Sequence, residues 1–114
     1  MSAGVYDITI EQGATFALTL TWLDTDGVTP INLTGYTARM KIKKSVGGTE
    51  IASLTNASGI TLGGVAGTIA ILIADTATAA YTFKRAVYDL ELVNGSTVTR
   101  LIEGNVILSR EVTV

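Results

Sequence analysis

Apolar and polar residues alternate strictly along two early segments of the chain. In the first segment, Phe16, Leu18, Leu20 and Trp22 lie on one face, with Thr15, Thr19 and Thr21 on the other. In the second segment, the two faces are Tyr36, Ala38, Met40 and Ile42, and Thr37, Arg39, Lys41 and Lys43. A period of two is typical of antiparallel strands with one buried face and one wet face. We therefore predict two such strands, joined by a polar connection with an Asp-Gly turn, Asp24–Pro30.

Short apolar runs between turn residues predict further strands. They span Val5–Ile10, Glu50–Leu54, Thr68–Ile73, Arg85–Val93, Thr97–Glu103 and Val106–Val112. Asn94-Gly95 favours a type I′ hairpin turn, because both residues tolerate positive φ. The glycine-rich segment 63–67 predicts a flexible turn between Ile60–Leu62 and Thr68–Ile73. Apolar residues on both faces of Thr68–Ile73 predict a central strand that is covered on each side.

One alanine-rich segment, residues 74–81, departs from the β pattern. Asp75 can cap a single helical turn, so we predict a short helical crossover near residues 75–81. A short helix between two sheets, just before a late strand, is typical of immunoglobulin-like sandwiches, and a tyrosine at Tyr88 fits either an anchoring role or an ordinary core position. We predict that residues 1–114 form a single all-β domain, an antiparallel immunoglobulin-like β-sandwich of about seven to eight strands.

Composition restricts the chemistry of this domain. Hydrophobic residues make up 47% of the 114-residue chain and charged residues 16%, which is too apolar for a disordered chain. Cysteine and histidine are both absent. Their absence removes disulfides, thiolate nucleophiles, His- and Cys-ligated zinc sites, and the usual general base near neutral pH. We therefore expect no enzyme, no catalytic residue, no metal site and no cofactor.

The charge balance favours neither nucleic acid nor a membrane as a partner. The net charge is −2 and the isoelectric point is near 4.9. The start of the chain has no basic region followed by an apolar run, and no segment approaches the length of a membrane span. We expect a soluble protein that is made in the cytoplasm.

Three small groups of charged residues could carry chemistry, and each has a simpler interpretation. Lys41, Lys43 and Lys44 suit a solvated strand face better than a phosphate site. Asp24 and Asp26 precede Gly27 as in half a calcium loop, but the remaining ligands do not follow, so a plain turn is favoured. Asp89 and Glu91, with Asp75, resemble a glycosidase carboxylate pair. We interpret Asp89 and Glu91 as exposed acids that face Arg100 across the hairpin.

With no catalytic, metal, nucleic-acid or membrane feature expected, binding to other proteins is the function that the sequence still supports. Both ends of the chain read as strands, and edge strands pair readily with other chains. Thr15, Thr19 and Thr21 form a face that suits packing against neighbouring copies, and the mean hydropathy of +0.44 is high for a small monomer. A carbohydrate-binding module is an alternative, but most aromatic residues fall on the predicted core faces.

Five segments, in order, resemble a family of small proteins encoded among the structural genes of tailed bacteriophages and prophages. They are YDITIEQGATF from Tyr6 with LTLTW to Trp22, INLTGYTARMKIK from Ile31, GITLGG from Gly59, VYDLEL from Val87, and VTRLIEG from Val98. The second differs from the family's pattern at Asn32, where an acidic residue is usual. The domain is also similar to the immunoglobulin-like N-terminal module of phage baseplate upper proteins.

This resemblance implies a non-enzymatic virion protein that binds other virion proteins, commonly as a trimer. Longer relatives carry a receptor-binding module after this domain, and we do not expect direct host recognition from residues 1–114. The expected function is therefore that of a structural or adaptor protein of the tail or baseplate, located in the virion after synthesis in the bacterial host. A capsid decoration protein is the alternative within the same class.

Overall fold

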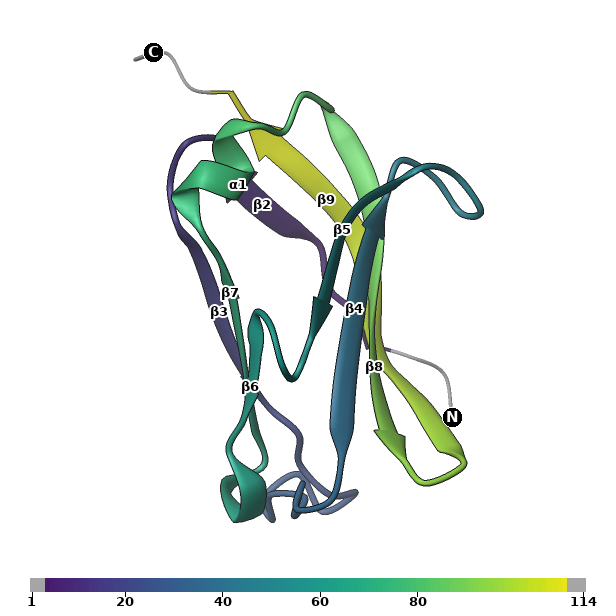
Figure 1. The fold of residues 1–114 in the computed structure, drawn as a ribbon. Helices are drawn as coiled ribbons and strands as arrows, with labels where there is room; N and C mark the ends of the chain where they lie inside the picture. Colours follow the sequence, from purple (N-terminus) through teal and green to yellow (C-terminus); the bar gives the residue numbers. More distant parts are fainter. Residues whose placement is uncertain (1–3, 111–114) are drawn as a thin grey trace.

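Two facing β-sheets make up the protein (Figure 1). The structure is a computed structural model that describes residues 4–110. The larger sheet has the order β1-β9-β8-β4-β5, with β2 also paired to β9, and the smaller sheet has the order β3-β7-β6. The elements are β1 (Gly4–Val5), β2 (Ile8–Glu11), β3 (Phe16–Thr21), β4 (Thr37–Lys43), β5 (Glu50–Thr55), β6 (Ile60–Leu62), η1 (Gly64–Ala66), β7 (Thr68–Ile73), α1 (Asp75–Ala79), β8 (Arg85–Asn94) and β9 (Thr97–Ser109).

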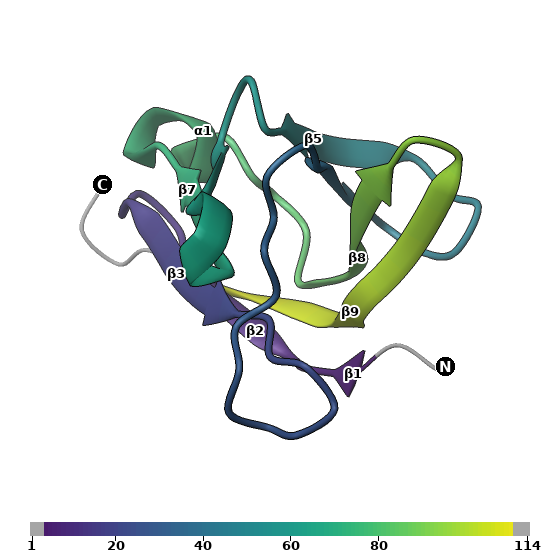
Figure 2. The same ribbon diagram turned by 90° about the horizontal axis from the view of Figure 1, so that it is seen from below.

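The strand order is that of an immunoglobulin-like sandwich. One sheet holds β3, β7 and β6, and the other holds β4, β8 and β9 with β5 added beyond β4, as in variable-type domains. The N-terminal strands β1 and β2 run parallel to β9, while the remaining strand pairs are antiparallel. The chain crosses from the small sheet to the large one through α1 (Figure 2). The predicted fold class is therefore confirmed.

The core lies between the sheets and is built from the inward residues of both. Ile10, Ile42, Ile69, Leu90, Leu92 and Val106 are fully buried. The period-two pattern predicted for β4 is confirmed, because Ala38, Met40 and Ile42 are buried while Arg39 and Lys41 are exposed. In β3 the same pattern holds, but its inward side chains are only partly buried. The reason is that β3 is an edge strand, so water reaches its inward side chains from the uncovered edge of the sandwich.

The last two predicted strands are one continuous strand. β9 runs through Gly104 and Asn105, where the sequence suggested a break, and residues 111 and 112 lie outside the described range. Gly104 and Asn105 stay extended because they pair with Tyr88 and Val87 of the equally long β8. The register shifts by one residue between Leu90, which pairs with Ile102, and Glu91, which pairs with Arg100.

The predicted hairpin at Asn94-Gly95 is present, but its turn type differs. Asn94 pairs with Thr97 and ends β8, so the two loop residues are Gly95 and Ser96. Of these only Gly95 has a positive φ, 61°. Glycine at the first loop position with positive φ is the pattern of a type II′ turn rather than a type I′ turn.

β7 is the central strand of its sheet, as predicted, but only one of its faces is buried. Ile69, Ile71 and Ile73 point into the core, whereas Leu72 on the other face is 55% exposed. The expectation that both faces are covered was wrong, because nothing in residues 4–110 packs over the outer face of the small sheet.

The helical crossover forms at the predicted place with a different anchor. Its N-cap is Ala74, which makes no side-chain capping bond, so the expected capping by Asp75 is wrong. The helix is held from its far end by Thr78, which is fully buried. The Thr78 hydroxyl donates to the carbonyl of Ala14 at 2.8 Å and accepts the N–H of Gly13 at 3.1 Å. This side chain ties α1 to the turn between β2 and β3. The helix and this turn lie at the same end of the sandwich (Figure 1).

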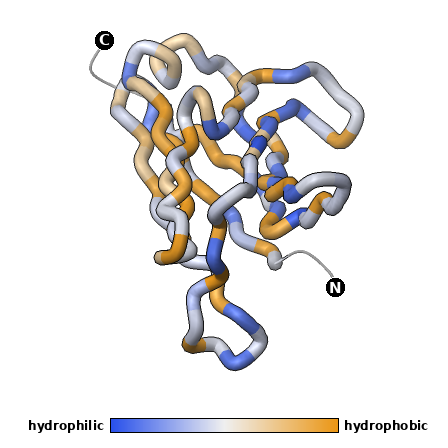
Figure 3. Tube along the Cα trace, turned by 60° about the horizontal axis from the view of Figure 1, so that its bottom comes forward, coloured by the Kyte–Doolittle hydropathy of each residue, from blue (hydrophilic) through white to orange (hydrophobic). Residues whose placement is uncertain are grey.

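A loop of mainly hydrophilic residues projects beyond the sandwich after β3 (Figure 3). It closes as a hairpin, since Asp24 N–H donates to Thr29 O at 2.7 Å and Leu23 forms a β-bridge with Pro30.

The helices of residues 4–110 are α1 and η1, and neither is long enough to cross a membrane.

Candidate functional site

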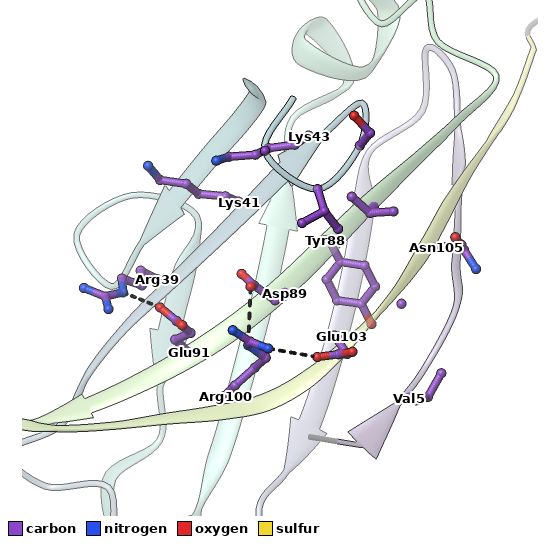
Figure 4. A pocket seen from close by; sticks show the side chains of 15 residues that line it. Val5, Arg39, Lys41, Lys43, Tyr88, Asp89, Glu91, Arg100, Glu103 and Asn105 are labelled. Atoms are coloured by element: carbon purple, nitrogen blue, oxygen red, sulfur yellow. Dashed lines mark hydrogen bonds and ion pairs between the residues drawn. The ribbon is translucent and has the colours of Figure 1, made fainter. Parts of the chain in front are cut away.

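A groove of about 710 Å³ is hollowed into the outer face of the large sheet. Its floor is made by β4, β8 and β9, and its rims are Val5 of β1 and the turn after β4 at Ser45–Gly47. Strand alternation places Arg39, Lys41 and Lys43 of β4 beside Glu91, Asp89 and Val87 of β8. A basic strand therefore lies against an acidic one (Figure 4).

The charges in this groove largely neutralise one another. Arg39 Nε lies 2.7 Å from Glu91 Oε1, and Lys41 Nζ lies 3.2 Å from Glu50 Oε1. Arg100 of β9 binds two carboxylates, Asp89 at 3.6 Å and Glu103 at 3.4 Å. Their side chains are exposed or half-buried at the surface, and surface pairs contribute about 0–1 kcal/mol each. The groove is a polar surface with little net field and no focused charge for an ionic ligand.

The lysine cluster proves to be a solvated strand face. Lys41 and Lys43 point outward from β4, and Lys44 follows the strand as an exposed residue. Lys41 is paired with Glu50, whereas Lys43 has no carboxylate partner within residues 4–110. Lys44 is likewise in no ion pair among the described residues, and two solvated lysines at the end of a strand do not make a phosphate site.

Asp89 and Glu91 lie on the face that the sequence predicted, but only Asp89 binds Arg100. Asp89 and Glu91 share the outer face of β8, as predicted. Arg100 pairs in register with Glu91, yet its guanidinium binds Asp89, while Glu91 binds Arg39 of the next strand. Asp75 begins α1 at the crossover and belongs to neither strand of the groove (Figure 1). The structure therefore does not bring the three carboxylates together.

Tyr88 combines the two roles that the sequence allowed. Its ring is 4% exposed in the core, and its hydroxyl donates to the backbone carbonyl of Tyr6. Burial, with the nearby Tyr6 and Asp7, raises the pKa of Tyr88 to about 12. The partner residue of Tyr88 in β9 is Gly104, where a Cβ would collide with the backbone of Tyr6. Tyr88 and Gly104 together hold the N-terminal segment against the edge of the large sheet.

The Asp24–Gly27 segment is a turn, as predicted. The Asp26 carboxylate accepts the Thr29 hydroxyl at 2.6 Å and the N–H groups of Val28 and Thr29 at 2.9 Å. These bonds, the Thr29 hydroxyl foremost, lower the pKa of Asp26 to about 2. The carboxylate is therefore used within the turn, and residues 4–110 contain no group of three acidic side chains that could hold a metal ion.

Most aromatic side chains are in the core, as predicted. Tyr81, Phe83 and Tyr88 are buried, and Phe16, Trp22 and Tyr36 are partly buried against the core. Tyr6 is 46% exposed, so no row of exposed rings lies on the described surface for stacking against sugars.

The opposite side of the molecule carries a second, chemically different surface. We call it the threonine face, and it consists of the outward residues Ala17, Thr19, Thr21, Thr61, Thr68, Ala70 and Leu72 of β3, β6 and β7. These three strands contain no Asp, Glu, Lys or Arg. Thr19 and Thr21 are exposed, as predicted, and Leu72 adds an apolar side chain at the centre. Sequence reasoning missed the contribution of Leu72, because it treated the outer face of β7 as covered.

Similarity to known proteins is found among solved structures alone. No protein-family model and no curated protein matches this chain. Among solved structures, a chain from a study of the multimeric cell-adhesive interactions of VGSC β subunits matches with 17% identity and a TM-score of 0.48. The match covers 97% of this chain and 96% of that chain.

Proposed function

We propose that this domain is a non-enzymatic assembly module that works through protein–protein contacts, as a structural or adaptor protein of a phage tail or baseplate. The observation that carries the proposal is the threonine face, where three adjacent strands present no charged side chain to solvent. The centres of protein interfaces are depleted in charged residues relative to other surfaces. A face of this kind is therefore suited to contact with another protein.

Placement in a phage particle rests on the resemblance of five ordered segments to phage structural proteins. Within that class, the groove adds no catalytic arrangement, since all of its charged side chains except Lys43 are engaged in ion pairs. The threonine face has no charged side chains, and the charges of the groove are mostly paired with one another. A domain with two such faces suits a position between other proteins.

The test is the location of the chain in intact particles. Particles are purified after prophage induction of the encoding bacterium, the chain is identified in them by mass spectrometry, and antibody-gold labelling gives its position. We expect a fixed copy number at the tail or baseplate. Labelling of the capsid would overturn the tail placement in favour of the decoration alternative, and absence from particles would overturn the whole proposal.

A matched pair of variants connects this location to the threonine face. Leu72→Asp places a charge at the centre of the face, and Val98→Asp places one at the far hairpin, where Val98 is 48% exposed. In complementation of a deletion strain, we expect Leu72→Asp to be lost from particles and Val98→Asp to be incorporated normally. Thermal unfolding of both purified variants confirms that each is folded. Equal incorporation of the two would show that this face makes no contact in the particle.

A further inference from the structure

The outer edge of β3 is an unprotected strand edge. β3 is the terminal strand of the small sheet, and within residues 4–110 nothing pairs with its free side. Its six residues contain no charge and no proline, and its register with β7 is continuous. Charged residues, proline, bulges and short length are the features by which edge strands avoid pairing with other chains. β3 has none of the first three.

The other edges of the sandwich do carry such protection. β6 is only three residues long. β5 begins with the ion-paired Glu50 and faces a register irregularity at Ile42 and Lys43. The N-terminal edge is divided into the short strands β1 and β2, with Asp7 between them. The contrast singles out β3 as the edge open to pairing.

The backbone groups that β3 leaves free are those of Ala17, Thr19 and Thr21. Trp22 N–H donates to Gly67 O at 2.8 Å on the β7 side, and Leu72 N–H donates away from β3, to Gly59 O. Because hydrogen-bonding direction alternates along a strand, the even-numbered residues of β3 bond to β7 and the odd-numbered ones point outward. Outward N–H and C=O groups at three alternate positions can accept one added strand.

We propose that a second copy of this chain pairs with β3 through its own β3, antiparallel, with Thr19 facing Thr19 on a two-fold axis. The proposal deepens the assembly role proposed above and rests on it for its biological use. In this register Ala17 faces Thr21 of the second copy, so the three outward residues of each strand form the hydrogen-bonded pairs. The two small sheets then form one continuous sheet.

The side chains of β3 fit this register on both faces. On the inner face, Leu18 lies beside Leu20 of the second copy, and Phe16 lies beside Trp22 of the second copy. These residues are only partly buried in the single domain, so pairing covers apolar surface that is otherwise reachable by water. On the outer face the pairs are Thr–Thr and Ala–Thr, which bring no like charges together. A strand that matches itself in this way identifies a second copy as the partner.

The contact between two short strands is small. Stable interfaces bury more than about 1,000 Å², so we expect weak association in solution, with a Kd of roughly 0.1–1 mM. Repeated copies on a particle raise the effective concentration and make such a contact sufficient.

Sedimentation equilibrium of the purified protein, from micromolar to millimolar concentration, tests the pairing. The dimer Kd of the unchanged chain is compared with those of two variants that place opposite charges at Thr19. Thr19 is exposed in the single domain, so Thr19→Lys and Thr19→Glu leave the fold intact, as circular dichroism will verify. In the paired state each variant sets two like charges directly opposite one another. We expect each variant alone to dimerise about five- to tenfold more weakly than the unchanged chain, and their equimolar mixture to recover the original Kd within about threefold.

Thr61→Lys is the matched control, because Thr61 is exposed on the same face but belongs to β6, away from the β3 edge. We expect its Kd to equal that of the unchanged chain. A strict monomer at millimolar concentration, a trimer, or a dimer insensitive to Thr19 variants would overturn the proposal. These results leave particle location untouched, so failure of the pairing is distinguishable from failure of the assembly role. A complex with a strand of another virion protein, in place of the homodimer, would likewise overturn the pairing.

Discussion

Two single side chains, Tyr88 and Thr78, connect segments of this fold that are far apart in the sequence. Tyr88 fixes the N-terminal segment through the carbonyl of Tyr6, and Thr78 fixes the crossover helix through the Gly13–Ala14 turn. Both side chains are buried and each satisfies backbone groups that are far away in sequence. Their contribution to stability is therefore larger than that of the exposed ion pairs in the groove.

Tyr88→Phe removes the hydroxyl while keeping the ring in the core. We expect the free energy of unfolding to fall by about 1–2 kcal/mol, because the hydrogen bond is lost and the Tyr6 carbonyl loses its partner. Urea unfolding measures the change. The control is Tyr6→Phe, since the Tyr6 side chain is partly exposed and its carbonyl remains in place. A loss of equal size in both variants would contradict the anchoring role.

The raised pKa of Tyr88 gives stability a defined dependence on alkaline pH. Its pKa is about 12 in the folded chain and about 10 in the unfolded chain, so the folded state holds the proton more tightly between these values. The stabilisation is present below pH 10 and is lost as pH rises toward 12, by about 2–3 kcal/mol in total. Between pH 9 and 12 the unfolding free energy of the unchanged chain should therefore fall relative to that of Tyr88→Phe, so that the two curves meet and then cross. Parallel curves would show that Tyr88 does not titrate in this way.

At the scale of elements, alternation in the sequence predicts most strands because burial of one face is a local property. β3 and β4 lie where the period-two pattern places them, and β7 has the bounds predicted from its apolar run. Pairing partners are not local, and here prediction was weaker. Gly104-Asn105 looks like a break until β8 supplies Tyr88 and Val87 as partners. Arg100 binds Asp89 rather than its register partner Glu91, which is bound by Arg39 of β4.

The crossover helix gives a test at this scale. Its five residues carry no side-chain cap at the N-terminus, so Thr78 is its principal anchor. We expect Thr78→Val to lower the free energy of unfolding by about 2 kcal/mol, because Gly13 N–H and Ala14 C=O lose their partner inside the protein. Thr78→Ser keeps the hydroxyl and should lose less than half as much. Thermal unfolding of the two variants measures both losses. A larger loss in Thr78→Ser than in Thr78→Val would show that packing of the threonine methyl group, rather than the hydrogen bonds, anchors the helix.

At the scale of the whole molecule, the two outer faces differ in kind. The large sheet presents paired charges over its groove, and the small sheet presents the threonine face with its open β3 edge. The sequence predicted the exposure of Thr15, Thr19 and Thr21 from their alternation with apolar residues. It could not show that β7 is covered on one side only, or that β3 is the unprotected edge, because both depend on which strands become neighbours.

The central claim is that the domain assembles through the edge of β3, and backbone hydrogen exchange tests it most directly. The amides of Ala17, Thr19 and Thr21 point away from β7, whereas those of Leu18 and Leu20 bond to it. Exchange is followed by NMR at micromolar and at millimolar protein. The account predicts that the three outward amides become protected at high concentration while Leu18 and Leu20 stay unchanged. Outward amides that exchange equally fast at both concentrations would contradict it.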